Sequence, residues 1–296
     1  MLREPGTPAP EPPPGLASRI DRSLVALIIP GDGESLFFVG SGTLVRLGGV
    51  ELVFTAAHNL VDDERKALYP RELVTVHAPP RHLFLPLTVG GGAPSIARIH
   101  VPGPPDNEGD IWPDVAVLEL TTDAILRSER EPFEAGSLGS FPSTLHSDDA
   151  WVAGFPIASV DAKNPQFAFT PQLVRVVTFP GARHSKEPAE GRGVHVLLGG
   201  PAFSHSLRQD VDMPHPHGMS GGPLAVGADL ASLLLVGLAT RYHRSRQDEW
   251  CEPTVEAVRL LIDHENEAVR DAAQRLVTQL TPSTSLETSQ TPASSE

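Results

Sequence analysis

Cysteine is almost absent from this chain, because Cys251 is the single one among 296 residues. No intramolecular disulfide can form, whereas small secreted domains usually depend on several. Positive charge is also scarce, since 23 Lys and Arg stand against 37 Asp and Glu for a formal net charge of −14. A chain this acidic is a poor ligand for nucleic acid or for an anionic membrane surface.

Long apolar runs are missing as well. No window of the sequence is long and apolar enough to span a bilayer. The first residues, M-L-R-E-P-G-T-P-A-P, lack the apolar core of a secretory signal. Together with the single cysteine, these features predict a cytoplasmic protein, of bacterial type, without a membrane partner. Hydrophobic residues still make up 40% of the chain, which is enough for a sizeable core.

The most informative segment that is present spans residues 217–224 and reads H-G-M-S-G-G-P-L. Ser220 stands among three glycines, and glycine tolerates backbone angles that a Cβ forbids. A serine in such a tight turn can expose its hydroxyl while neighbouring backbone N–H groups converge on one point. Acyl-transfer enzymes form a nucleophile and an oxyanion hole in this way.

A serine hydroxyl is a weak nucleophile unless a histidine removes its proton. The chain has twelve histidines, and one of them, His58, ends the apolar segment L-V-F-T-A-A-H, whose small residues leave room around the ring. The ring in turn needs a carboxylate that fixes its tautomer. Asp114 is the best candidate because it opens D-V-A-V-L-E-L, a predicted buried strand, whereas Asp106 and Asp110 lie in a loop rich in proline and glycine.

These three segments, in the order His, Asp, Ser, resemble the trypsin-like serine peptidases of the chymotrypsin fold. The matching motifs are T-A-A-H at 55–58, D-V-A-V-L at 114–118 and G-M-S-G-G-P at 218–223. Three further segments resemble strands of that family, namely G-S-G-T-L-V at 40–45, V-A-G-F-P at 152–156 and V-G-L-A-T at 236–240. The resemblance covers about residues 22–245 and is to the bacterial intracellular type that lacks a PDZ domain.

The resemblance implies an all-β fold of two antiparallel six-stranded barrels. Short apolar runs separated by turns agree with this fold class, and apolar residues from Val255 onward recur at helical spacing. The expected organisation is a disordered proline-rich N-terminus (1–18), a first barrel (19–130) with His58 and Asp114, a connection (131–149), a second barrel (150–250) with Ser220, a C-terminal helix (251–280) and a disordered tail (281–296).

In function, the resemblance implies a serine endopeptidase that acts on a peptide or protein. Ser220 would attack the scissile carbonyl, His58 would carry the proton, and Asp114 would hold the ring. The backbone N–H groups of Gly218 and Ser220 would bind the oxyanion. No metal or cofactor is needed, and the sequence identifies no regulatory partner. His215 and His217 suggest zinc, but no third ligand has suitable spacing.

Two departures from the family bear on how the protein would be activated and on which peptide bonds it would cleave. Met219 stands where zymogen-activated members carry an aspartate, so a freed N-terminus has no partner there. The turn must be held another way, and apolar packing of Met219 is the simplest candidate. Pro214 stands where members that cut after Lys or Arg carry an acid. His217 and Thr240 are further candidates for the substrate cleft. Thr240 either hydrogen-bonds Asp114 or the substrate backbone, or is an ordinary strand threonine.

Other functional classes stay open. Residues 218–222 also satisfy G-x-S-x-G, the nucleophile elbow of α/β-hydrolases, but that elbow needs a helix directly after the serine. Here Gly-Gly-Pro follows, which opposes a helix. A catalytically silent peptide-binding module and an esterase with the same three residues are the remaining alternatives.

Overall fold

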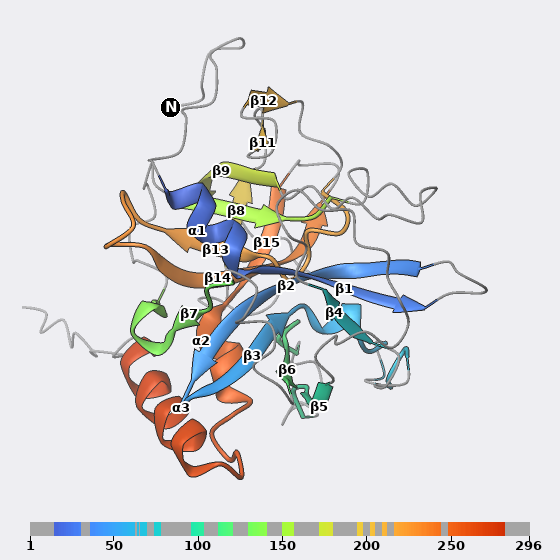
Figure 1. The fold of residues 1–296 in the computed structure, drawn as a ribbon, viewed down its shortest axis with the longest axis vertical. Helices are drawn as coiled ribbons and strands as arrows, with labels where there is room; N and C mark the ends of the chain where they lie inside the picture. The colour runs from blue at the N-terminus through green and yellow to red at the C-terminus, as the bar shows by residue number, and fades with distance from the viewer. Residues whose placement is uncertain are drawn as a thin grey trace, which may run out of the picture.

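The chain folds mainly into β-strands, which form two antiparallel sheets with few helices among the described residues (Figure 1). This computed structural model describes residues 15–30, 36–62, 64, 66–69, 74–77, 96–103, 112–120, 130–140, 150–156, 172–179, 194–197, 202–204, 209–211, 216–243 and 248–281. Its strand content agrees with the all-β class predicted from the sequence. No helix in these segments is long and apolar enough to cross a membrane.

The first sheet lies in the N-terminal half of the chain and has the strand order β4-β1-β2-β3-β6-β5. A two-residue strand, β7, pairs in parallel with β2. The strands are β1 (Leu24–Pro30), β2 (Leu36–Leu47), β3 (Val50–Thr55), β4 (Thr75–His77), β5 (Ile96–His100), β6 (Ala116–Leu120) and β7 (Phe133–Glu134).

The second sheet has the strand order β10-β15-β14-β13-β8-β9-β11-β12, and β10 also pairs with β9. Its strands are β8 (Ala150–Gly154), β9 (Gln172–Phe179), β10 (Val194–Leu197), β11 (Ala202–Ser204), β12 (Gln209–Val211), β13 (Pro223–Val226), β14 (Leu234–His243) and β15 (Asp248–Pro253). Within the described residues the sheets therefore have seven and eight strands rather than the predicted six, because β7 joins the first and the β11–β12 hairpin extends the second.

The first sheet is buried on both faces, which explains its nearly continuous apolar strands. Successive side chains of a strand point to opposite faces. In β3, Leu52 and Phe54 belong to a core cluster that also contains residues of the second sheet and the C-terminal helices, whereas Val53 belongs to a separate cluster within the first sheet. In β6, Val117 joins the former cluster and Leu118 the latter. One apolar core thus connects both sheets and the helices.

Helix α1 (Leu16–Ser23) corrects the predicted N-terminal boundary. Residues 16–18 were expected to be disordered, but they form the first turn of this helix. Leu16 and Ile20, four residues apart on one helix face, are both fully buried in the shared core. The proline-rich composition before residue 15 concealed this short amphipathic segment.

Two further boundaries also differ from the prediction. The predicted connection (131–149) contributes β7 to the first sheet, and its Leu138 forms a bridge with Leu235 of β14, so it contacts both sheets. Residues 141–149 lie outside the described residues. The predicted helix over 251–280 begins later, because residues up to Pro253 pair with β14. It is divided into α2 (Thr254–Arg259) and α3 (Glu267–Leu280), and the Asn266 side chain caps the second.

The turn between β2 and β3 contacts the start of α3. Gly48 and Gly49 both have positive φ angles, of 57° and 81°, as a two-residue hairpin turn requires. A Cβ at Gly48 would lie 2.5 Å from backbone atoms of Ala268 and Val269, whereas a Cβ at Gly49 would meet nothing within 4 Å. The absence of a side chain at Gly48 therefore lets α3 lie against the first sheet.

This contact predicts different costs for the two alanine substitutions. Gly49→Ala introduces only backbone strain, of about 1 kcal/mol. Gly48→Ala introduces the same strain and also displaces α3, so its loss of unfolding free energy should be larger by at least about 1 kcal/mol. Urea unfolding of both variants measures the difference. Equal losses would show that α3 does not depend on this turn.

Candidate active site

The two sheets bring the three predicted residues to one place. Strand β3 ends at Thr55 and is followed by a 3-10 helix, η1 (Ala57–Asn59), that carries His58. Asp114 comes just before β6, and Thr55 pairs with Ala116 in the antiparallel β3–β6 ladder. The end of β3 and the start of β6 therefore share one edge, which places His58 next to Asp114. Ser220 lies in the turn that precedes β13.

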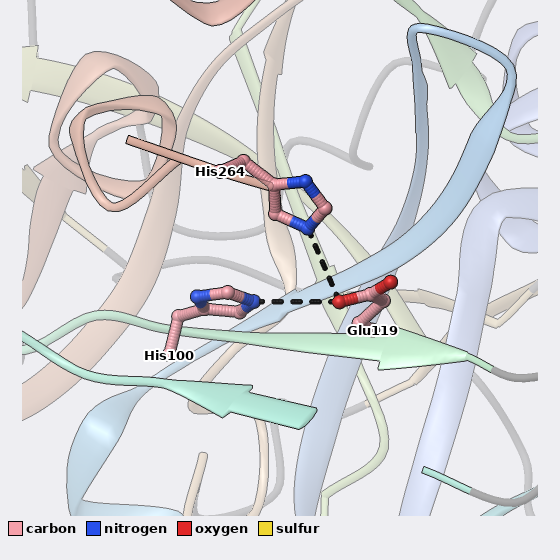
Figure 2. Close-up of side chains that lie close together, drawn as sticks. All are labelled: His100, Glu119 and His264. Atoms are coloured by element: carbon pink, nitrogen blue, oxygen red, sulfur yellow. Dashed lines mark hydrogen bonds and ion pairs between the residues drawn. The ribbon is translucent and has the colours of Figure 1, made fainter. Parts of the chain in front are cut away.

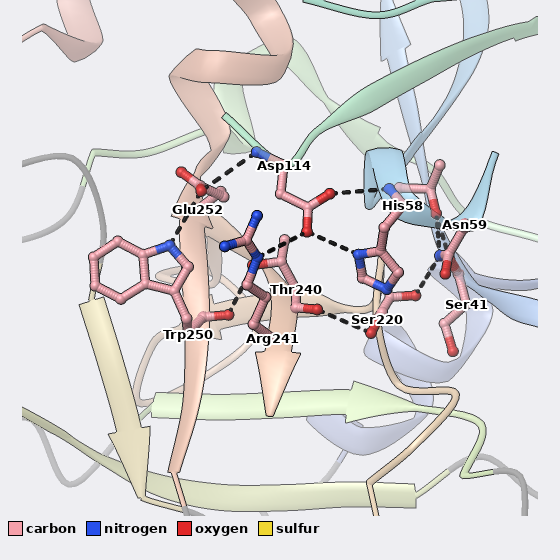
Figure 3. Close-up of polar contacts among 10 residues, drawn as sticks. Ser41, His58, Asn59, Asp114, Ser220, Thr240, Arg241, Trp250 and Glu252 are labelled. Carbon is pink, nitrogen blue, oxygen red and sulfur yellow. Dashed lines mark hydrogen bonds and ion pairs between the residues drawn. The ribbon is translucent and has the colours of Figure 1, made fainter. Parts of the chain in front are cut away.

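Asp114 holds His58 through two hydrogen bonds (Figure 3). Its Oδ2 lies 2.8 Å from the ring Nδ1, and its Oδ1 accepts the backbone N–H of His58 at 3.0 Å. The carboxylate is buried, whereas the His58 side chain is 47% exposed. An ionised carboxylate can only accept at Nδ1, so the neutral ring carries its proton there and has a lone pair at Nε2. That tautomer is the one a general base requires.

The surroundings of Asp114 favour its ionised form. Burial raises the pKa of this carboxyl, but the hydrogen bonds and charge of His58, and then the charge of Arg241, outweigh that effect and hold the pKa below its usual value. The Arg241 Nε lies 3.4 Å from Oδ2, with its guanidinium half-exposed at the end of the site. No sequence motif marks Arg241, since an arginine in a strand carries no motif of its own.

The Ser220 turn has the backbone geometry expected of an anion-binding loop. Gly218 and Gly221 have φ angles of 100° and 92°, which a residue with a Cβ rarely adopts. The N–H of Met219 donates to Pro216 O at 2.9 Å, and the N–H of Gly221 donates to Ala239 O at 2.7 Å. Within the described part of the chain, the N–H groups of Gly218 and Ser220 have no acceptor. They are the two groups predicted to form an oxyanion hole.

Residues of the first sheet fix this turn from one side. Ser41 on β2 donates its hydroxyl to Gly218 O at 2.7 Å and its backbone N–H to Ser220 O at 2.9 Å. Asn59 donates its side-chain amide to the same Ser220 oxygen at 3.0 Å. A Cβ at Gly221 would collide with the Ser41 carbonyl oxygen. The sequence showed only that 40–45 is a strand, although the position of Asn59 directly after His58 was a usable signal.

Apolar packing supports the turn from the other side. Met219 is fully buried, and a Cβ at Gly154 of β8 would lie 2.8 Å from its Cα. Gly154 belongs to the V-A-G-F-P segment, so the close approach of these two segments accounts for the glycine there. The turn is thus held by the Ser41 and Asn59 hydrogen bonds and by burial of the Met219 side chain, without an acidic partner beside the serine.

The Ser220 hydroxyl donates to the backbone oxygen of Thr240 at 3.1 Å. In Figure 3 the His58 ring lies between the Asp114 carboxylate and this hydroxyl. Hydrogen bonds between a nucleophile and its base are often loose without substrate. Rotation about the Ser220 Cα–Cβ bond would turn the hydroxyl away from the Thr240 oxygen.

Other predicted cleft residues are placed differently. The Thr240 hydroxyl donates to Trp250 O at 3.0 Å, so among the alternatives left open for this residue the structure favours an ordinary strand threonine over a bond to Asp114. Burial of that hydroxyl between strands explains the difference, since a buried donor takes the nearest backbone acceptor. His217 is exposed beside Gly218, whereas Pro214 lies outside the described residues.

A second polar cluster joins the first sheet to the start of α3 (Figure 2). The Nε2 atoms of His100 and His264 lie 3.7 Å and 3.1 Å from Glu119 Oε2. The backbone N–H of Asn266 donates to Nδ1 of His264, so the neutral ring has its proton on Nε2, where a metal would need a lone pair. Burial, and then the His264 charge, lower the pKa of His100. The cluster therefore fits a hydrogen-bonded anchor for α3 better than a metal site.

Comparison with known protein families and with curated proteins found no match to this chain. The assignment of its chemistry therefore rests on the residues and on their geometry. His58, Asp114 and Ser220 come together around a half-exposed imidazole and two N–H groups that have no acceptor among the residues that the structure describes. Such an arrangement can deprotonate a hydroxyl, and it can stabilise an oxygen anion 3 Å away.

The contribution of Ser41 to the shape of the Ser220 turn can be tested by comparing Ser41→Ala with the same substitution at a serine of similar burial, Ser23. Ser23 is equally buried and donates its hydroxyl to Ile20 O at 2.7 Å, at the end of α1. We expect Ser41→Ala and Ser23→Ala each to lower the unfolding free energy by about 1–3 kcal/mol. Only Ser41→Ala should also slow covalent labelling of Ser220 by a fluorophosphonate, by about tenfold. Equal labelling rates would show that the turn keeps its shape without Ser41.

Proposed function

We propose that this protein is a serine endopeptidase of the trypsin-like class, which hydrolyses peptide bonds through an acyl-enzyme on Ser220. The observation that carries this proposal is the buried Asp114 carboxylate, which holds His58 by two hydrogen bonds beside the Ser220 turn. The carboxylate fixes the ring in the tautomer that accepts a proton at Nε2. The substrate would be a peptide or protein, and the proposed mechanism needs no cofactor.

The chemistry follows from this arrangement. Ser220 Oγ attacks the scissile carbonyl carbon while its proton passes to Nε2 of His58. The Gly218 and Ser220 N–H groups stabilise the oxyanion, each typically contributing about 3 kcal/mol to transition-state binding. The tetrahedral intermediate releases the amine, which takes the proton from His58. A water molecule then repeats the sequence on the acyl-enzyme and restores the Ser220 hydroxyl.

We further propose that the two sheets form two β-barrels. The pairing of β10 with both β15 and β9 supports two barrels, because each of the six strands β8, β9, β10, β15, β14 and β13 then pairs with two others of the six, and β9 also pairs with β11. Closing a sheet in this way removes exposed strand edges. The active site would lie between the two barrels, where the β3–β6 edge meets the turn before β13.

Competing functions are supported less well. The nucleophile elbow of an α/β-hydrolase requires a helix after the serine, but β13 begins at Pro223. Cleavage after Lys or Arg has no support, because Pro214 stands where family members with that preference carry an acid. A silent peptide-binding module or an esterase would have the same geometry. A cytoplasmic location is also part of the proposal, since the single cysteine of the sequence, Cys251, cannot form an intramolecular disulfide.

The decisive test is covalent labelling of Ser220. We expect wild-type protein to react with a fluorophosphonate and to cleave a peptide library, and Ser220→Ala and His58→Ala to do neither while melting normally. Asp114→Asn should slow both reactions by up to roughly ten-thousandfold, because the ring loses its tautomer. An unlabelled wild-type protein would indicate a silent binding module, and hydrolysis of esters but not peptides would indicate an esterase.

No proteolytic maturation should be required. Zymogen-type cleavage near Arg19 or Arg22 would cut helix α1, whose Leu16 is buried in the shared core. Arg19 also donates to the backbone oxygens of Glu131 and Pro132. Full-length protein, verified by intact mass, should therefore label with the fluorophosphonate directly. If only a species trimmed near Arg19 or Arg22 reacted, this expectation would be wrong.

A further inference from the structure

A second buried carboxylate lies directly behind Asp114. Glu252 on β15 is 2% exposed, and its Oε1 accepts the indole N–H of Trp250 at 3.1 Å and the backbone N–H of Asp114 at 3.4 Å (Figure 3). Its Oε2 is buried and has no hydrogen-bond partner among the described residues. The Asp114 backbone is therefore held by a side chain that comes from the other sheet.

An acid is an unexpected choice for this position. In the described part of the chain no Lys, Arg or His side chain forms an ion pair with Glu252, since the nearby Arg241 bonds Asp114 instead. A glutamine would accept the same two N–H groups without placing a charge in the core. The position thus costs stability when ionised, and a functional use of the charge would explain why the residue is an acid.

Charged groups surround Glu252 on several elements. Asp114 precedes β6, Arg241 lies on β14, His58 lies on η1, and Glu256 on α2 pairs with Arg259. Burial raises the pKa of Glu252 to about 7; the two N–H donors oppose this rise, and the charges of Asp114 and Glu256 reinforce it. The carboxyl therefore titrates in the range where a peptidase would work.

We propose that Glu252 is a positioning residue of the active site, whose carboxylate holds the Asp114 backbone and whose negative charge strengthens His58 as a base. This inference rests on the proposed function. When Glu252 is ionised, a second negative charge lies behind Asp114 and stabilises the imidazolium that forms as Ser220 attacks. When it is protonated, that stabilisation is lost and the Asp114 N–H has a weaker acceptor.

Labelling then depends on the ionisation of Glu252 as well as on an unprotonated His58 Nε2, but a protonated Glu252 lowers the rate several-fold rather than abolishing it. On the acid side, the logarithm of the labelling rate in the wild-type protein should therefore rise with a slope above 1 over the pH range in which Glu252 titrates and with a slope of about 1 below that range. Glu252→Gln should give a slope of about 1 and a several-fold lower plateau. The matched control is Glu256→Gln, which removes a buried acid that pairs with Arg259; loss of its charge should lower the pKa of Glu252 and move the steep part of the profile to lower pH without removing the steepness.

A titration that needs no catalysis separates this inference from the proposed function. Nuclear magnetic resonance of the His58 ring protons should give a lower pKa in Glu252→Gln than in wild-type or Glu256→Gln protein. Glu252→Asp retains the charge but shortens the side chain. Its His58 pKa should therefore lie closer to the wild-type value than that of Glu252→Gln, although the bond to the Asp114 N–H is lost.

The pH dependence of stability gives a further check. The folded pKa of Glu252 is raised, so wild-type protein should lose stability relative to Glu252→Gln as pH rises from about 4.5 to about 7.

The outcomes are distinct. An unchanged His58 pKa in Glu252→Gln, together with an unchanged acid slope, would overturn the role of Glu252. Failure of wild-type protein to label would overturn the peptidase proposal, and the His58 titration would still decide whether Glu252 acts on the ring. A lowered His58 pKa and a reduced slope, both absent from Glu256→Gln, would support the inference.

Discussion

The hydrogen bonds by which Ser41 and Asn59 hold the Ser220 turn form a polar seam between the two sheets, and this seam sets the geometry of the candidate active site. Ser41 and Asn59, which belong to the first sheet and its η1 extension, donate three hydrogen bonds to the backbone of the Ser220 turn. The same edge of the first sheet carries His58 and Asp114. A serine turn from one sheet is therefore fixed directly against the histidine and aspartate of the other. Any change in how the sheets pack would separate these groups.

The seam also requires the backbone of the Ser220 turn to approach the neighbouring strands β2 and β8 closely. Gly221 lies so near the Ser41 carbonyl oxygen that no side chain fits, and Gly154 makes room for the buried Met219. At Gly221 the positive φ angle adds a second reason for glycine. The glycines around Ser220 thus serve tertiary contact as well as turn geometry. This is why a segment rich in glycine can remain well packed rather than loose.

Two buried acids in the site differ in their partners, and the difference explains their different states. Asp114 receives two hydrogen bonds from His58 and has the Arg241 cation nearby, so its pKa falls despite burial. Glu252 receives only neutral N–H groups and faces other acids, so its pKa rises. Equal burial therefore produces opposite shifts, because a charge in a low-dielectric interior depends on the groups that compensate it. At His264 the partner decides the tautomer instead, since the Asn266 N–H donates to Nδ1 and the proton of the neutral ring lies on Nε2.

The sequence by itself determined the β-rich class and the candidates His58, Asp114 and Ser220, because each is marked by its neighbours at the end of an apolar strand or within a glycine turn. It also indicated the C-terminal helical segment, through apolar residues at helical spacing. Only the tertiary structure decided which groups support those candidates. Glu252 is 138 residues from Asp114 and Ser41 is 177 from Gly218. Burial and partner choice at such separations follow from how the sheets pack, so local pattern left Glu252 and Arg241 undetected, left the partner of the Thr240 hydroxyl undecided and missed the helix at Leu16–Ser23.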